Sequence, residues 1–118
     1  MTVRRLKTYT GSQGYVYQYY FVGQRAAEPS EVPGTEYIFD VTSDRETTYA
    51  VSVFLPHQVV SDWDQAHGRV LKDSEQYAAA KLRLFRAFDE IDYILASESH
   101  LEIDLPILEQ SLTSLGIA

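Results

Sequence analysis

Residues 37–55, YIFDVTSDRETTYAVSVFL, decide the fold of this chain. Two runs rich in β-branched and aromatic residues, 37–42 and 47–55, flank the polar segment 43–46, which is the pattern of a β-hairpin. A three-residue loop, 44–46, sets a register in which the large apolar side chains of both strands share one face. These side chains are Tyr37, Phe39, Val41, Tyr49, Val51, Val53 and Leu55. The patterning therefore predicts an odd loop length, although the loop has no glycine for a left-handed position.

A second hairpin is predicted upstream. Residues 3–9 and 15–22 are rich in β-formers, and the segment between them, TGSQG, holds two glycines suited to a turn. The odd positions of the second run are all aromatic, and the even positions are mostly apolar, so we expect this strand inside the sheet rather than at its edge. Segment 23–34 contains two prolines and is predicted to be a long surface loop.

The hydrophobic spacing changes from two residues to three or four after Leu55. Pro56 opens a short amphipathic helix that ends at Gly68. A long helix is predicted from 73 to 96, with Asp73 as N-cap and Gln76 three residues on, as in a capping box. Segment 97–104 is predicted to be a loop. A last helix begins with Asp104 as N-cap and carries four leucines on one face, Leu105, Leu108, Leu112 and Leu115.

Strands in the first half and helices in the second predict an α+β fold. We expect a single domain over residues 1–118, with a β-rich half, 1–55, and a helical half, 56–118. The expected architecture is a four-stranded antiparallel sheet, made of the two hairpins, followed by three C-terminal helices packed on one face. A long helix and a leucine-faced helix together present more apolar surface than is needed to cover so short a sheet. We therefore also expect a homodimer joined through the helices.

Composition narrows the class of partner. The chain has a net charge of −7, and from Pro56 onward it carries 11 acidic residues against 5 basic ones. An acidic surface repels phosphate backbones and favours basic partners, so nucleic acid ranks behind protein as a partner. No cysteine is present, which excludes disulfides, thiolate metal sites and a cysteine nucleophile. No apolar run of about 18 residues occurs and no signal peptide is recognisable, so we expect a cytoplasmic protein without a membrane span.

The sequence motifs predict no catalytic residue, metal ion or cofactor. The three histidines, at 57, 67 and 100, lack the spacing of a helical zinc site. Asp64 and His67 are three residues apart on one helix, where we interpret the histidine as a partner of the helix dipole, oriented by Asp64. Asp89, Glu90 and Asp92 are interpreted as a solvated helix face beside Arg86. The segment GSQG at 11–14 lacks the spacing of a phosphate-binding loop.

The tyrosines of the two hairpins are the most unusual feature of the sequence. An unpaired buried hydroxyl costs about 1–3 kcal/mol, so a tyrosine stripe suits a wet cavity or an interface as well as a core. Three alternatives follow: core packing, a protein interface, or a platform for a ligand or single-stranded nucleic acid. The residues expected to bind a ligand or partner are Tyr15, Tyr17, Tyr19, Tyr37, Tyr49, His57, Trp63 and His67.

Two functional hypotheses follow from these features. The first is a small, soluble, acidic binding or regulatory protein that acts through protein–protein contacts, for example as an inhibitor of a basic partner. The alternative is a small-molecule-binding or enzymatic site under the 23–34 loop, with tyrosines as its walls and His57 or His67 as acid or base.

Overall fold

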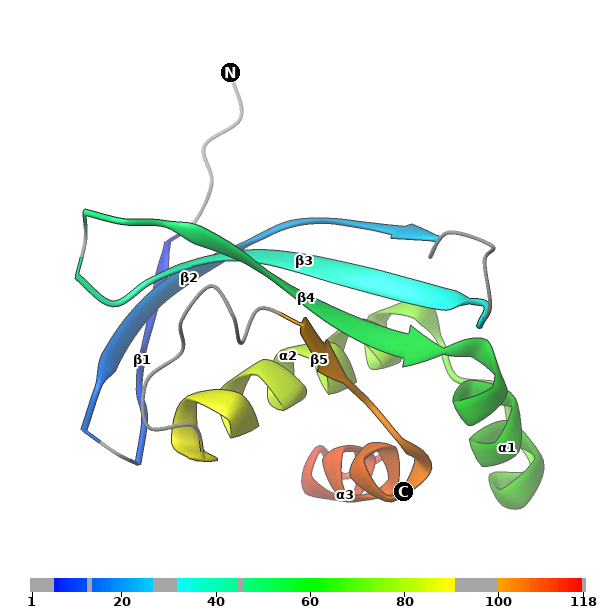
Figure 1. The fold of residues 1–118 in the computed structure, drawn as a ribbon. Coiled ribbons are helices and arrows are strands. Elements are labelled where there is room, and N and C mark those ends of the chain that lie inside the picture. The colour runs from blue at the N-terminus through cyan, green and yellow to red at the C-terminus, as the bar shows by residue number, and fades with distance from the viewer. Residues whose placement is uncertain (1–5, 13, 27–31, 45, 91–99, 118) are drawn as a thin grey trace.

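The computed structural model describes residues 6–12, 14–26, 32–44, 46–90 and 100–117. It consists of a five-stranded sheet and three helices that lie on one face of it (Figure 1). The strands are β1 (Lys7–Thr10), β2 (Val16–Ala26), β3 (Gly34–Thr42), β4 (Tyr49–Pro56) and β5 (His100–Glu102), and they follow one another in that order across the sheet. The helices are α1 (His57–His67), α2 (Asp73–Glu90) and α3 (Leu105–Ser114). The α+β class, the two antiparallel hairpins and the three helices are confirmed.

The predicted count of four strands is wrong because β5 adds a fifth, which runs parallel to β4. It forms within the segment that was predicted to be a loop. A strand of three residues is too short to show alternation, and its pairing depends on the return of the chain to β4. Leu101 provides the reason for this docking, since its side chain is buried while those of His100 and Glu102 are exposed. The sheet is therefore mixed rather than purely antiparallel.

The loop predicted over 23–34 is longer than the connection between strands in the structure. Strand β2 continues to Ala26 and β3 begins at Gly34, so both ends of this segment belong to the sheet. The register between β2 and β3 shifts between Phe21 and Gly23, as at a β-bulge. A glycine inside a strand commonly marks such an irregularity, whereas the two prolines that follow Gly23 predict a loop. Residues 27–31 lie outside the described residues.

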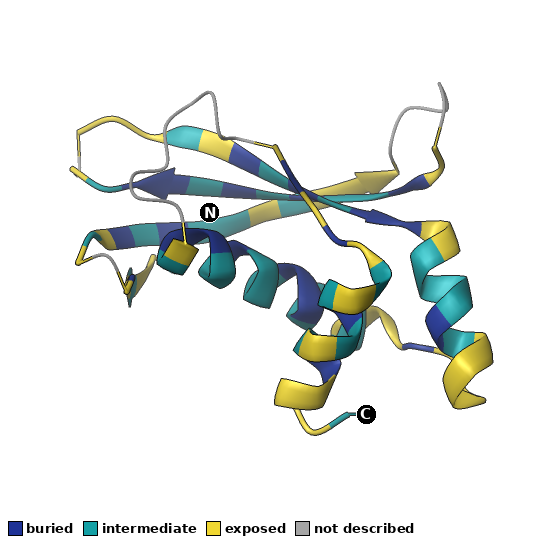
Figure 2. Ribbon diagram, turned by 60° about the horizontal axis from the view of Figure 1, so that its bottom comes forward, coloured by how far each residue is buried: buried dark blue, intermediate teal, exposed yellow. Residues whose placement is uncertain are grey.

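The register of the second hairpin is confirmed. Phe39 pairs with Val51, so that the seven apolar side chains predicted to share a face do share it. Six of them are buried, and Tyr49 is half-buried. Strand β2 lies between β1 and β3, as its two apolar faces predicted. The buried positions of the sheet and of α2 face one another across a common core (Figure 2).

All three helices begin close to the predicted positions, and α1 and α3 also end close to them. Gly68 terminates α1 in the left-handed conformation, with φ of 65°. The Asp104 side chain caps α3 by accepting a hydrogen bond from the Ile107 backbone N–H at 2.9 Å. At the start of α2 the capping prediction is shifted, because the Glu75 carboxylate accepts the backbone N–H of Lys72, directly before the helix. The described part of α2 ends at Glu90, so the predicted extension to residue 96 lies outside the described residues.

Helices α1 and α2 contact the sheet, and α3 packs against both of them. Leu108 and Leu112 of α3 are fully buried in this position. The leucine face that motivated the expected dimer is therefore largely covered within one chain. No described element covers the opposite face of the sheet (Figure 1).

Candidate functional site

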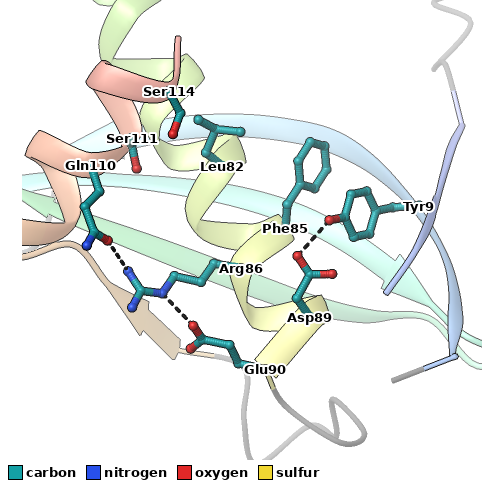
Figure 3. A pocket seen from close by; sticks show the side chains of 9 residues that line it. All are labelled: Tyr9, Leu82, Phe85, Arg86, Asp89, Glu90, Gln110, Ser111 and Ser114. Atoms are coloured by element: carbon teal, nitrogen blue, oxygen red, sulfur yellow. Dashed lines mark hydrogen bonds and ion pairs between the residues drawn. The ribbon is translucent and has the colours of Figure 1, made fainter. Parts of the chain in front are cut away.

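A cleft of about 300 Å³ lies where β1, α2 and α3 meet (Figure 3). Its apolar wall is made by Tyr9, Leu82 and Phe85. The ring of Tyr9 stacks on that of Phe85, with 4.4 Å between centroids and 8° between planes. Such stacking fixes two rings from distant segments in one orientation. The cleft therefore has a rigid apolar surface at the junction of the strand and the helix.

Asp89 is held in the cleft by the first hairpin. Its Oδ2 accepts a hydrogen bond from the Tyr9 hydroxyl at 2.9 Å, and its Oδ1 accepts the Ser12 backbone N–H at 3.0 Å. Burial, followed by the hydrogen bond and the negative charge of Asp89, raises the pKa of Tyr9. Tyr9 thus stays protonated and continues to donate throughout the neutral range.

Arg86 connects the two helices that border the cleft. Its Nε donates to Glu90 Oε1 at 2.9 Å, and its guanidinium also donates to Gln110 Oε1 at 3.1 Å (Figure 3). The ion pair of Arg86 and Glu90 joins residues four apart on α2, and the contact with Gln110 ties it to α3. The charged side chains that line the cleft are the carboxylates of Asp89 and Glu90 and the guanidinium of Arg86, which together give a net charge of −1.

The cleft combines hydrogen-bond acceptors with an apolar wall. Glu90 is exposed at its mouth, and the hydroxyl groups of Ser111 and Ser114 line the α3 side. Lysine and arginine side chains pack their methylene stems on apolar surface while their charged ends bind carboxylates and hydroxyls. The arrangement is therefore suited to a basic side chain. Among the residues that the structure describes, no three His, Cys, Asp or Glu side chains are grouped to hold a metal ion.

The predicted tyrosines lie mainly in the core. Tyr17, Tyr19 and Tyr37 are buried on the face covered by the helices. The Tyr17 ring stacks on Phe88 of α2 at 4.2 Å, and Tyr19 meets Phe85 edge-on at 5.5 Å. The two remaining tyrosines, at 15 and 49, are half-buried against the same core. None of these five lines the cleft.

Trp63 and His67 lie together at the other end of the helical layer. Trp63 is fully buried, and the His67 ring stacks on it with 4.2 Å between centroids. His67 Nε2 lies 2.9 Å from Glu109 Oε1, which links α1 to α3. The expected orientation by Asp64 is wrong, since the Asp64 carboxylate accepts the Leu71 backbone N–H at 3.0 Å. The third predicted residue of this group, His57, is exposed at the first position of α1.

A second hollow, of about 360 Å³, lies on the face of the sheet opposite the helices. There the Tyr20 hydroxyl donates to Asp40 Oδ2 at 2.6 Å. On the same face, Ser52 Oγ lies 2.9 Å from His100 Nδ1, across the β4–β5 pair. His100 is exposed, and neither Ser52 nor His100 lines either of these two cavities. We interpret this pair as a contact that secures β5 to its neighbour.

Sequence reasoning identified only part of the cleft. It recognised Arg86, Asp89 and Glu90 as polar residues of one helix, since they are close in sequence. It missed Tyr9 and Gln110. Tyr9 precedes its partner Asp89 by 80 residues, and Gln110 follows its partner Arg86 by 24 residues, so tertiary structure alone brings them to the cleft. No local pattern could have connected these three segments.

Comparison with protein families, curated proteins and solved structures finds no match for this chain. None of the described helices is both long and apolar enough to span a membrane.

Proposed function

We propose that this protein is a non-catalytic binding protein, an inhibitor or regulator, whose helical half receives a basic protein partner. The charge distribution supports the choice of partner, because the helical half carries 11 acidic residues against 5 basic ones. Complementary charge accelerates encounter with a basic surface and excludes acidic competitors. The protein would then act by binding to its partner and would catalyse no reaction.

The cleft between α2 and α3 is the observation that carries this proposal. A lysine or arginine of the partner would lay its stem along Phe85 and Leu82 and bring its charge to the exposed carboxylate of Glu90. The hydroxyl groups of Ser111 and Ser114 would accept further hydrogen bonds from the same group. Because Arg86 is already held by Glu90 and Gln110, the site is formed before the partner arrives.

The variant Glu90→Gln tests the proposal with little risk to folding. The Glu90 side chain is 61% exposed, and among the described residues its one ion pair is with Arg86, four residues earlier on the same helix. We expect about tenfold weaker capture of the partner from cell lysate, since a charge-assisted hydrogen bond is lost, and a steep loss of binding with salt. Captured proteins are to be identified and quantified by mass spectrometry.

Asp62→Asn is the matched control for this experiment. It also removes one negative charge from a helix, where Asp62 accepts a hydrogen bond from Gln58, four residues earlier. Capture should be unchanged in this variant if the cleft, rather than net charge, selects the partner. Equal weakening by both variants, or recovery of the bait alone by the unmodified protein, contradicts the proposal.

The alternative of a tyrosine-lined small-molecule site has less support. Tyr17, Tyr19 and Tyr37 pack against rings of α2 and β3, and neither described cavity is lined by them. The centre of the loop expected to cover such a site, 27–31, lies outside the described residues. We therefore place the binding function in the cleft and not in the tyrosine cluster.

A further inference from the structure

The hollow on the face of the sheet opposite the helices has a volume of about 360 Å³ and is formed by the strand register. Its lining consists of Leu6, Gln18, Tyr20, Asp40, Thr42 and Thr48. Tyr20 pairs with Asp40 across β2 and β3, and Gln18 pairs with Thr42. Residues two apart on a strand point to the same side, so the two pairs lie next to each other on one face. The register thereby gathers polar side chains from two strands at one place.

A short hydrogen bond fixes the centre of the hollow. The Tyr20 hydroxyl donates to Asp40 Oδ2 at 2.6 Å, a distance typical of a hydroxyl bound to a carboxylate. Both side chains are half-buried, so the bond holds the ring and the carboxylate in one arrangement. A carboxylate has about four acceptor positions, and Asp40 can therefore hold Tyr20 and also accept from a ligand.

The charge of the lining argues against an anionic ligand. Among the described residues that line the hollow, Asp40 is the one charged side chain, and no lysine or arginine accompanies it. A phosphate or carboxylate would meet a negative charge there without a cation to neutralise it. The ligand is therefore neutral or basic.

The uncharged side chains favour a neutral ligand that carries many hydroxyl groups. The Gln18 amide and the Thr48 hydroxyl each donate and accept hydrogen bonds. An amine would use only the acceptors among these groups, whereas a hydroxylated ligand uses donors and acceptors alike. Leu6 and the Tyr20 ring add apolar surface for the C–H groups of such a ligand. The volume of about 360 Å³ falls within the roughly 300–1,000 Å³ of small-molecule sites.

We propose that this hollow is a saccharide-binding site, which receives one sugar ring of a neutral glycan. Asp40 accepts hydrogen bonds from sugar hydroxyls, and Gln18 both donates to the sugar and accepts from it. The Tyr20 ring packs against the C–H groups of the sugar. The site lies on the other side of the sheet from the cleft between α2 and α3, and it does not depend on the proposal of a basic protein partner.

Titration of the isotope-labelled protein with simple sugars, followed by NMR of its amide groups, tests the site directly. The probes are the methyl glycosides of glucose, galactose, mannose and N-acetylglucosamine, at up to about 50 mM, which detects a dissociation constant in the millimolar range. At least one glycoside should shift the side-chain amide signals of Gln18 and the backbone amide signals of Tyr20 and Asp40. The side-chain amide of Gln110, in the cleft, should stay unchanged. Glycerol controls for hydroxyl groups without a sugar ring, and methylammonium chloride tests for a basic ligand.

Two variants on β2 form a matched pair for this experiment. Gln18→Ala should weaken binding of the glycoside about tenfold, because a donor and an acceptor are both lost. Gln24→Ala makes the same change at an exposed position outside the hollow and should leave the affinity unchanged. Asp40→Asn, which keeps the shape of the side chain, should also weaken binding about tenfold or more. Circular dichroism establishes that each variant is folded.

Four results would overturn the proposal. The first is that none of the four glycosides shifts the signals of the hollow. The second is that glycerol shifts them as strongly as a glycoside does, and the third is that methylammonium shifts them while the glycosides do not. The last is that Gln18→Ala binds the glycoside as tightly as Gln24→Ala does.

Discussion

Several tyrosines place a polar hydroxyl group within or beside the apolar core. Tyr37 is the clearest case, because its side chain is 1% exposed and lies on the buried face of β3. Burial, followed by the charge of Asp73, raises the pKa of Tyr37 from 10.0 to about 12. Tyr9 and Tyr19 shift in the same direction, in each case mainly through burial. We therefore expect alkaline pH to destabilise the tyrosine-rich core.

We expect the stability of the protein to fall between pH 10 and pH 12 because of Tyr37. Below this window the phenol is protonated in both states and favours neither. Within it the unfolded state releases a proton that the folded state retains, so rising pH favours unfolding. A shift of this size corresponds to about 2–3 kcal/mol in the free energy of unfolding. Urea unfolding across the window should show a smaller loss in Tyr37→Phe than in the unmodified protein. Equal losses contradict the assigned pKa.

The elements differ in how far sequence could predict them. The hairpin at 37–55 was predicted in register because seven apolar residues recur at every second position and share one face when the loop length is odd. The helices were predicted because proline, glycine and aspartate mark their ends. Strand β5 was missed because three residues show no period, and it exists only because β4 is there to pair with it. The cleft was missed for the same reason, since it is made of contacts between elements.

The turn between β1 and β2 depends on a close approach to the end of α2. Gly11 is buried, and a Cβ atom there would lie 2.3 Å from the carbonyl oxygen of Phe88. Backbone atoms on both sides leave little room for adjustment. We expect Gly11→Ala to lower the free energy of unfolding by about 1–3 kcal/mol, as overpacking does. Chemical denaturation monitored by circular dichroism measures this difference.

Gly23→Ala is the control for Gly11→Ala, since a Cβ atom at Gly23 would meet nothing within 4 Å. Its effect should stay within about 1 kcal/mol, because only the conformational preference of the backbone changes. Similar destabilisation at both positions would show that loss of glycine itself, and not the approach of the turn to α2, is responsible.

At the scale of the whole molecule, the helices cover one face of the sheet and also cover one another. Leu108 and Leu112 of α3 are fully buried, and of the four leucines predicted to share a face only Leu115, directly after α3, is largely exposed, at 41%. The open face of the sheet carries apolar residues of similar exposure, such as Val16 at 48%. The homodimer expected from the leucine pattern stays a prediction, and Leu115 is the leucine of that pattern that one chain leaves largely exposed.

Light scattering of the protein at micromolar concentration tests this prediction. A homodimer has twice the chain mass of 13.4 kDa. If the end of α3 forms the contact, Leu115→Lys should restore the single-chain mass, because a charge buried in an apolar interface without a partner is strongly unfavourable. Val16→Lys introduces the same charge on the opposite face and should leave the dimer intact. A single-chain mass for the unmodified protein contradicts the homodimer, and dissociation by Val16→Lys alone would place the contact on the sheet, where an uncovered apolar face is the physical reason to associate.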